Sequence, residues 1–560
     1  MDILGVYCFG QHDSSAALLR DGRVLAACEE ERFTRNKFDN CFPAESIAFC
    51  LGQNSIEARD LDAVAFGWNP RLHRLEKALH ILKHFPRSLR VLTRSGPRHL
   101  RLDSFARHFS NRTNFRGPVH LVNHHLAHAA SAFFLSPFEE AAILTIDGVG
   151  EWETVWMGRG RGLELEKTRS QGWPHSLGNV YTSATQYLGF QMYSDEYKVM
   201  GLAPYGRPIY LDLFRKMTPL TDGGFGVDTS YFGYHVGKNL TYSKKFIREL
   251  GPPREPRGEI LPRHQDIAAS LQARTEEIIV HLVKEALQHT KTKYLCLAGG
   301  VALNSVAVGK IIELGLAEEV YVPPCAGDAG VSLGAALYVA HHLSGQERQE
   351  PLLDARLGPE WSDEVIRETL EGTGLPYQEW TEGETVAALA AGQVVGWFQG
   401  RMEFGQRALG ARSILADPRR PEMKDLINAK VKFREAFRPF APAVPEERLS
   451  EFFHGTHPSP FMTQVYRVRE ESRPLLRAVT HVDGTARVQT VRRDFNPKFW
   501  SLLQAFEAQA GVPVLLNTSF NLRGEPIVNT PEEAVKSFLR ADLDLLVMGR
   551  WAARKDPGKP

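Results

Sequence analysis

The sequence predicts an α/β protein whose first domain contains two copies of one structural plan. Residues 2–9 form an apolar strand, the polar loop GQHDSS follows, and AALLR and RVLAACEEE flank the pair Asp21-Gly22, which is typical of a hairpin turn. The same order of strand, acid-bearing loop and hairpin returns in AAILTI, DGVGE and ETVWMGRGRGLELE. This repeat favours two related halves that face a nucleotide cleft, while two unrelated hairpins remain the alternative.

A third element predicts where a nucleotide binds. The stretch runs from strand YLCLAGG to helix VALNSVAVGKIIEL, strand EEVYVPP, loop CAGDAG and helix VSLGAALYVAHHL. Glycine turns at the carboxyl ends of strands bind anions, because backbone N–H groups and helix amino termini converge there. Gly299, Gly300 and Asn304 therefore form a candidate nucleotide site, with Asn304 placed to hydrogen-bond a ribose or base. The two repeats described above resemble in pattern the layout of the actin-like (ASKHA) ATPase superfamily.

Two histidines and two acids form a candidate metal site. His124 and His128 are one helical turn apart in NHHLAHAASAF, so both imidazoles can reach one cation. The zinc-protease motif HExxH is excluded because His125, and not a glutamate, follows the first histidine. Asp147 ends the strand AAILTI and Asp328 lies in the later glycine loop. The alternatives are histidines satisfied by hydrogen bonds at a helix start, and a helix N-cap role for Asp328.

Length and composition indicate a globular protein of more than one domain. The 560 residues are 43% hydrophobic, and 67 Lys plus Arg nearly balance 66 Asp plus Glu, so no global field attracts nucleic acid or membrane. The amino terminus is too polar for a signal peptide and no apolar run approaches ~18 residues, which predicts a cytoplasmic location. The six cysteines contain no CxxC, so neither a zinc knuckle nor a disulfide framework is indicated. We expect a first domain over residues 1–345, a linker over 346–362 and a second domain over 363–560.

One segment is strongly basic. Residues 71–116 hold twelve Lys or Arg against two acids, Glu76 and Asp103. Its first part predicts a helix with Pro70 at its first position and with Leu75, Leu79 and Leu82 on one face. A solvated helical insertion is the favoured interpretation; a surface for an anionic acceptor or partner, and a nucleic-acid surface, remain open.

The second domain is rich in cations between residues 395 and 440. They stand among Phe, Pro and Gly, which predicts partial burial, and buried cations need anions. Near the end of the chain, VPVLLNTSFN predicts a strand that runs into a small polar loop. This combination suits phosphate and carbonyl oxygens better than an apolar ligand. The cations concerned are Arg407, Arg412, Lys432, Arg434 and Arg438.

Ordered motifs along nearly the whole chain carry a family resemblance. They are HDSSAALLRDG, EEERFTR, NHHLAHAASAF, DGVGE, DEYKVMGLAPYG, AGGVALN, PPCAGDAG, FGQRALGARSIL, VKFREAFRPFAP, HVDGTARVQTV and LLNTSFN. The sequence resembles the carbamoyltransferase family that includes the tobramycin and nodulation carbamoyltransferases. The resemblance implies a duplicated actin-like first domain, related to the last enzyme of threonylcarbamoyladenosine formation, and an α+β YrdC-like second domain, related to the adenylate-forming enzyme of that pathway.

The resemblance also implies a two-step reaction. Carbamoyl phosphate and ATP, with Mg²⁺, give carbamoyladenylate in the second domain. The first domain then transfers the carbamoyl group to a hydroxyl of a small-molecule acceptor and releases AMP. The residues implied to hold carbamoyl phosphate and the ATP phosphates are Arg407, Lys432, Arg438, Arg487, Asn517 and Ser519.

In the first domain, the resemblance implies that His124, His128, Asp147 and Asp328 bind a divalent metal, iron(II) in the best-matched motif. Manganese and zinc also suit two imidazoles and two carboxylates. Further roles are implied for the nucleotide ligands Gly299, Gly300 and Asn304, for Lys198 near the same cleft, and for His12 and Asp13. The last two would bind the carbamoyl group or accept the hydroxyl proton, a task that suits a neutral histidine.

Three other functions remain as alternatives. Threonylcarbamoyl transfer to transfer RNA needs a wide basic face, whereas the net charge here is +1. A hydrogenase-maturation carbamoyltransferase is disfavoured by the missing CxxC pairs. A nonenzymatic actin-like ATPase scaffold explains the glycine loops but not the HxxxH pair. We expect no nucleic-acid or membrane partner, and the sequence predicts no oligomeric state.

Overall fold

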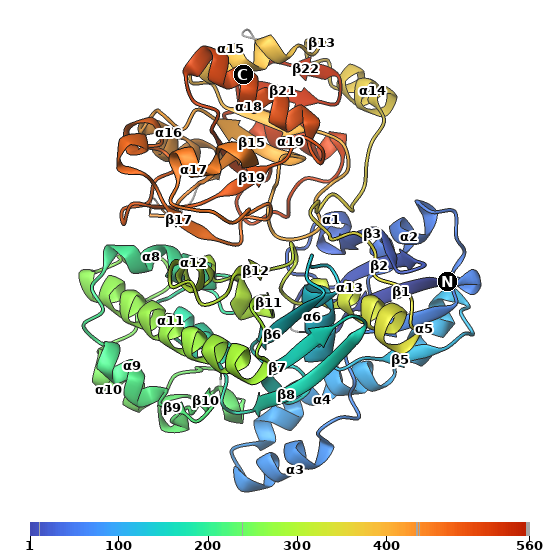
Figure 1. Ribbon diagram of the computed structural model, residues 1–560, viewed down its shortest axis with the longest axis vertical. Helices are drawn as coiled ribbons and strands as arrows, with labels where there is room; N and C mark the ends of the chain where they lie inside the picture. The colour runs from blue at the N-terminus through green and yellow to red at the C-terminus, as the bar shows by residue number, and fades with distance from the viewer. Residues whose placement is uncertain (11, 238, 433–434, 436, 556–560) are drawn as a thin grey trace. The chain divides into compact units, whose positions relative to one another are not determined.

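The computed structural model describes residues 1–10, 12–237, 239–432, 435 and 437–555, and it divides into two compact units (Figure 1). The first unit holds Met1–Glu30 and Phe38–Leu352; the second holds Glu31–Lys37 and Leu353–Pro560. The short segment Glu31–Lys37 joins the second unit through two arginines. Arg32 donates to the carbonyl of Gly405 at 2.7 Å, and Arg35 donates to the carbonyl of Ile527 at 2.7 Å. The motif EEERFTR therefore fixes loops of the second unit.

Two five-stranded sheets of one topology form the centre of the first unit. Their strand orders are β3-β2-β1-β4-β5 and β8-β7-β6-β11-β12, each with three antiparallel strands followed by two parallel ones. The predicted duplication and the mixed α/β class are thereby confirmed. The strands are β1 Asp2–Tyr7, β2 Ser15–Arg20, β3 Arg23–Glu29, β4 Ala63–Phe66, β5 Val119–Leu121, β6 Glu140–Ile146, β7 Glu153–Arg161, β8 Glu164–Gly172, β11 Tyr294–Ala298 and β12 Glu319–Tyr321.

A pair of helices lies between the sheets. Helix α13 (Gly330–Leu337) packs on β1, β2 and β4, helix α6 (His124–Phe133) packs on β6 and β11, and the two helices pack on each other. Gly334 permits this approach, because a Cβ there would lie 1.9 Å from the carbonyl oxygen of Ala127. The remaining helices of this unit are α2 Ala44–Gly52, α3 Arg74–Lys83, α4 Leu89–Asp103, α5 Phe105–Thr113, α7 Leu177–Tyr187, α8 Glu196–Leu202, α9 Leu211–Met217, α10 Lys244–Leu250, α11 Pro262–Thr290 and α12 Ser305–Glu313.

Two predicted helix boundaries were wrong. Pro70 is not the first residue of a helix: α3 begins at Arg74, after His73 in the left-handed conformation. The helix expected over 301–314 is broken, because a 3₁₀ turn spans Gly300–Leu303 and α12 starts only after Asn304. In both places local backbone geometry, which periodicity does not report, sets the start.

An eight-stranded sheet dominates the second unit, in the order β13-β22-β21-β14-β15-β20-β16-β19. Helices α14 Asp363–Thr373, α15 Glu382–Ala390, α16 Glu422–Leu426, α17 Leu449–Phe452, α18 Pro497–Ala510 and α19 Pro531–Arg540 accompany it. Its strands are β13 Tyr377–Glu379, β14 Val395–Phe398, β15 Arg412–Ala416, β16 Ala441–Pro445, β19 Gln489–Val491, β20 Leu515–Ser519, β21 Leu545–Met548 and β22 Trp551–Ala553, with β17 Val465–Arg467 and β18 Thr485–Arg487 paired separately. Across the described part of the chain, every helix is too short or too polar to cross a bilayer.

A histidine fixes the turn that leads into β18. The Nδ1 atom of His481 lies 3.3 Å from Thr485 Oγ1, which donates to Asp483 at 2.7 Å. The hydroxyl therefore accepts a hydrogen bond from the N–H at Nδ1, and among the described residues Nε2 of His481 has no hydrogen-bond partner. Burial lowers the pKa of His481 to about 4, and Arg487 adds to the effect against the opposing charge of Asp483.

This histidine should make the second unit less stable in mild acid. Its pKa is about 4 when folded against 6.5 for the ordinary group, so the unfolded chain binds the extra proton in that window. Its contribution is complete above pH 6.5 and is lost as the pH falls towards 4. We measure the free energy of unfolding by urea titration at about pH 7.5 and about pH 5. Between these two pH values, we expect it to fall by about 1–3 kcal/mol less in His481→Gln than in the wild type. The same substitution at the exposed His454 is the control, and equal pH dependence in both variants would contradict the assignment.

Candidate functional site

Four side chains from three parts of the first unit meet at one buried point. His124 and His128 come from the first turns of α6, Asp147 follows β6, and Asp328 lies just before α13. The two histidines are 0% exposed and the two aspartates 9% and 8%. One possible ligand atom from each residue lies within 4.8 Å of the others. The structure thus brings together the four residues predicted as metal ligands.

The spacing within this cluster fits a single first-row cation. Nε2 of His124 is 3.2 Å from Nε2 of His128, 3.2 Å from Asp147 Oδ2 and 3.6 Å from Asp328 Oδ1, and the last oxygen is 3.8 Å from Nε2 of His128. Ligands at about 2.1 Å from one cation are separated by about 3.0–3.4 Å in octahedral or tetrahedral geometry. Two imidazole nitrogens that face each other also need a proton or a cation between them. The residues can therefore hold a divalent metal.

Neighbouring groups orient three of the four candidate ligands. Tyr7 donates its hydroxyl to Asp328 Oδ2 at 2.7 Å, and the N–H of Gly300 donates to Asp147 Oδ1 at 3.1 Å. Each carboxylate is held by one oxygen and presents the other to the histidines. Nδ1 of His124 lies 3.4 Å from the carbonyl of Gly67, which can only accept, so Nε2 is the nitrogen that faces the carboxylates. Among the residues that the structure describes, Nδ1 of His128 has no hydrogen-bond partner.

Charge pairing keeps the carboxylates ionised despite burial. Burial and the charge of Asp328 raise the pKa of Asp147, but the hydrogen bond and charge of His124 outweigh them and bring it to about 2. Burial lowers the pKa of His124, while Asp147 and Asp328 raise it to about 10. The pocket is thus built around two negative charges, which suits a cation.

The start of α6 is fixed by a buried acid that is not a metal ligand. Glu151, in the DGVGE loop, accepts the backbone N–H groups of His124 at 3.0 Å and Asn69 at 2.7 Å, and the side-chain amide of Asn123 at 2.9 Å. A carboxylate at a helix amino terminus also favours the helix dipole. The histidine between the two ligands has a structural role: His125 makes hydrogen bonds to Thr145 Oγ1 at 2.6 Å and to the carbonyl of Glu153 at 2.9 Å.

His12 and Asp13 form an ion pair in the first loop. Nδ1 of His12 donates to Asp13 Oδ2 at 2.7 Å. Burial lowers the pKa of His12, but the charge and hydrogen bond of Asp13, with smaller contributions from Asp328 and Asp147, raise it to about 10. This pairing favours the protonated imidazole, whereas the sequence suggested a neutral one, and the role of His12 stays a prediction. The negative charges of Asp328 and Asp147, at the candidate metal site, thus also act on His12.

The glycine pair after β11 supports the metal site. Gly299 has φ +89°, and a Cβ there would lie 2.2 Å from the carbonyl oxygen of Ile146, so only glycine fits. Gly300 then directs its N–H to Asp147. Asn304 caps α12 by accepting from Ala307 N at 3.1 Å, and its amide pairs in both directions with Gln272 at 3.0 Å. Its proposed contact with a nucleotide would require Gln272 to share these bonds.

The N-cap alternative for Asp328 was wrong. Ala329 is the N-cap of α13 and has no side-chain cap hydrogen bond, while the Asp328 carboxylate faces His124 and Tyr7. Lys198, on α8, forms an ion pair with Asp195 at 2.9 Å. Its predicted position near the nucleotide stays a prediction.

In the second unit, the structure joins Lys432 to the polar loop after β20. Its ammonium donates to the backbone carbonyl of Ser519, to Ser519 Oγ at 3.3 Å and to Asn521 Oδ1 at 2.8 Å. Asn517 donates to Gln489 Oε1 at 2.7 Å and to the carbonyl of Ala408 at 3.2 Å, beside Arg407. Among the described residues, Oδ1 of Asn517 is buried without a partner. Three predicted segments, around residues 407, 432 and 519, are therefore tied to one another.

The other predicted cations have mixed roles. Arg438 lies 3.8 Å from Glu435, and Arg487 ends β18. Arg412 is fully buried, donates to the carbonyls of Gly400 at 3.0 Å and Pro359 at 3.2 Å, and stacks 3.6 Å from the Phe398 ring. Carbonyl dipoles and an aromatic face stabilise this charge, so Arg412 is structural. Arg434 lies outside the described residues.

Sequence reasoning missed Tyr7, Glu151 and Gln272. Tyr7 ends the first strand and Glu151 ends the quoted motif DGVGE, so their positions beside the loops were a usable signal. Gln272 lies inside the long helix α11, far along the chain from Asn304, and no local pattern marks it.

The fold and this cluster define a mixed α/β protein whose first unit repeats one sheet topology and has a buried site that can hold a divalent cation. A sequence profile described as "Carbamoyltransferase N-terminus" matches residues 2–337, and one described as "Carbamoyltransferase C-terminus" matches residues 386–555. The chain therefore belongs to the carbamoyltransferase family, and it is a transferase.

Several individual proteins are similar to this chain. Nodulation protein NolNO of Sinorhizobium fredii is 41% identical over 98% of this chain and 80% of its own length. The 3'-hydroxymethylcephem-O-carbamoyltransferase of Amycolatopsis lactamdurans is 37% identical over 53% of this chain and 55% of its own. Among solved structures, HypF of T. kodakarensis is similar with a TM-score of 0.32 and 16% identity, over 62% of this chain and 48% of its own.

The Tyr7 hydroxyl should matter for metal affinity beyond its effect on stability. In Tyr7→Phe, Asp328 loses the donor that orients it, and we expect the affinity for Mn²⁺, Zn²⁺ or Fe²⁺ to fall by about 10–100-fold in titration calorimetry. Tyr181→Phe is the matched control, because it removes a similar hydrogen bond, to Gln272 at 3.1 Å, that does not involve the cluster. Unchanged affinity in Tyr7→Phe, or an equal loss in the control, would contradict the assignment.

Proposed function

We propose that this protein is an ATP-dependent O-carbamoyltransferase that makes carbamoyladenylate and transfers its carbamoyl group to a hydroxyl of a small-molecule acceptor. In the first step carbamoyl phosphate loses its phosphate, a carbamate oxygen bonds to the α-phosphorus of ATP, and pyrophosphate leaves; one water is consumed. In the second step the acceptor hydroxyl loses its proton to solvent, its oxygen bonds to the carbamoyl carbon, the bond from that carbon to the phosphate oxygen breaks, and AMP leaves. The match of both carbamoyltransferase profiles, one in each unit, is the observation that carries the proposal.

The second unit would form the adenylate and correspond to the YrdC-like domain. The supporting observation is that Lys432 and Arg407 stand at segments linked through Ser519, Asn517 and Ala408. Two polyanions must approach each other in this step, and cations offset their repulsion and the charge on the leaving pyrophosphate. Arg438 and Arg487 would contribute further positive charge, and Mg²⁺ would accompany ATP.

The first unit would carry out the transfer. His124, His128, Asp147 and Asp328 would hold a divalent metal, which supplies a Lewis acid for the phosphate of the adenylate. His12, held as a cation by Asp13, would donate to the carbamoyl oxygen as negative charge develops there. The glycine loop at Gly299 and Gly300, with Asn304 and Lys198, would bind the adenosine part.

Pyrophosphate release tests the first step. We expect release from ATP to require carbamoyl phosphate, and to fall at least about 100-fold in Arg407→Ala, because one cation would no longer offset the approach of two anions. Arg492→Ala is the matched control, since this arginine pairs with Asp494 on the surface of the same unit. Mass spectrometry of the products should show carbamoyladenylate.

A substitution in one unit should abolish its own step of the reaction and leave the step of the other unit intact. His124→Ala should keep carbamoyl phosphate-dependent pyrophosphate release and lose transfer to an acceptor, together with bound metal. Release of pyrophosphate without carbamoyl phosphate would contradict the proposal that carbamoyl phosphate is the donor. Incorporation of threonine and bicarbonate would instead indicate threonylcarbamoyl transfer to transfer RNA, and ATP turnover with no adenylate would indicate an ATPase scaffold.

A further inference from the structure

Helix α3 of the first unit turns its apolar face to solvent. Leu75, Leu79 and Leu82 lie on one side of the helix and are 70%, 55% and 69% exposed. Phe85, one turn beyond, is 64% exposed, and Leu89 follows at 46%. The other exposed large apolar side chains of the described residues are mostly scattered along the chain. A surface helix normally directs such a stripe to the core, so this face is unusual.

The polar face of the same helix packs on the protein. Nε2 of His80 donates to the carbonyl of His235 at 2.9 Å, and its ring lies 5.9 Å from that of Trp152. The ring of His84 lies 5.2 Å from that of His235. These contacts fix the orientation of α3 and keep the leucines outward. Figure 1 shows α3 at the periphery of the first unit, outside both sheets.

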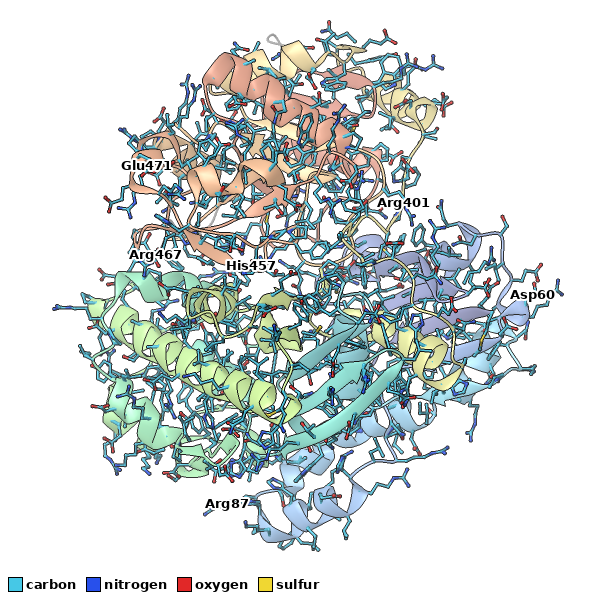
Figure 2. All side chains as sticks on the ribbon, viewed as in Figure 1. Asp60, Arg87, Arg401, His457, Arg467 and Glu471 are labelled. Atoms are coloured by element: carbon cyan, nitrogen blue, oxygen red, sulfur yellow. The ribbon has the colours of Figure 1, made fainter. Side chains whose placement is uncertain are left out.

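Positive charge surrounds the apolar stripe. Residues 71–116 hold twelve cations and two acids, which leaves 55 cations and 64 acids for the rest of the chain. A nearly neutral protein therefore has a local excess of about ten positive charges. Exposed cations beside the stripe are Arg71, Arg74, Lys83, Arg87 and Arg90. Figure 2 shows Arg87 beside α3 at the edge of the unit.

We propose that α3 and the turn after it dock this protein on an anionic lipid bilayer. Leu75, Leu79, Leu82 and Phe85 enter the boundary between headgroups and acyl chains, and the flanking arginines and lysine bind lipid phosphates. Apolar residues on one face and cations at its sides are the combination that holds a helix in the plane of a membrane surface. The net charge of the whole chain predicts no attraction to a membrane, because it does not report the local excess of positive charge around α3.

The charges favour a bilayer over two other partners. A second copy of the chain, joined through the same leucines, would bring two clusters of like charge together. A nucleic acid would pair with the cations but leave the leucines and Phe85 in water. An anionic bilayer accommodates both features at once. The proposal is independent of the carbamoyl chemistry.

Sedimentation with vesicles tests this docking. The full chain is mixed with vesicles of about three parts phosphatidylcholine to one part phosphatidylserine, and with vesicles of phosphatidylcholine alone. We expect binding to the mixed vesicles, at least about fivefold weaker binding to the neutral ones, and loss of binding in about 0.5 M NaCl. The double variant Leu75→Ser/Leu82→Ser should bind at least about tenfold less. The double variant Lys83→Glu/Arg87→Glu should lose binding to the mixed vesicles more than binding to the neutral ones.

Leu343→Ser/Leu539→Ser is the control, because both leucines are exposed, at 51% and 49%, and neither belongs to the basic segment 71–116. All substitutions replace exposed side chains, and equal melting temperatures confirm folding. No sedimentation of the wild-type chain, equal binding by the α3 leucine variant, or equal binding to neutral vesicles would overturn the proposal. A dimer in analytical ultracentrifugation that dissociates in Leu75→Ser/Leu82→Ser, without vesicle binding, would replace the bilayer with a second copy.

Discussion

The fold of the first unit depends on the neutralisation of the negative charges of two buried carboxylates. Asp147 and Asp328 lie at the ends of segments that the chain brings together from positions 181 residues apart. An unpaired buried carboxylate destabilises a fold by several kcal/mol, so these two acids need His124, His128 or a cation beside them. Tyr7 and the N–H of Gly300 each bind one carboxylate oxygen and turn the other inward. The sheets, the helix pair and the glycine loop all serve to bring these charges to one point.

Duplication explains how one fold supplies two different loops to the same place. The loop after β1 carries His12 and Asp13, and the loop after β6 carries Asp147 and Glu151, at the same step of the repeated topology. Each loop follows the central strand of its sheet, and α6 and α13 pack together between the sheets. The repeat thus fixes where the loops lie, while their side chains differ: one forms a His–Asp ion pair and the other supplies a candidate metal ligand.

Local patterns predicted the parts of the site that depend on local geometry. Two histidines at i and i+4 share a helix face wherever they occur, and an acid after a buried strand lies at the sheet edge, so His124, His128 and Asp147 could be found from sequence. Gln272 could not, because its partner Asn304 lies far along the chain, and the start of α12 could not, because periodicity does not record the 3₁₀ turn before Asn304. The placement of Glu31–Lys37 in the second unit has the same cause: Arg32 and Arg35 bind carbonyls of residues 405 and 527, and no periodicity records such a contact.

Burial alone does not distinguish a structural cation from one proposed to bind substrate. Arg412 and Lys432 were both expected from composition, and both are buried. Arg412 donates its hydrogen bonds to carbonyls within the β14–β15 region and lies on the Phe398 ring. This fixed arrangement keeps its charge in the core. Lys432 reaches the hydroxyl and amide of a loop that follows a strand end, where oxygens can exchange for those of a ligand. A sequence pattern of cations among Phe and Pro is common to both, and only the kind of acceptor around each charge separates them.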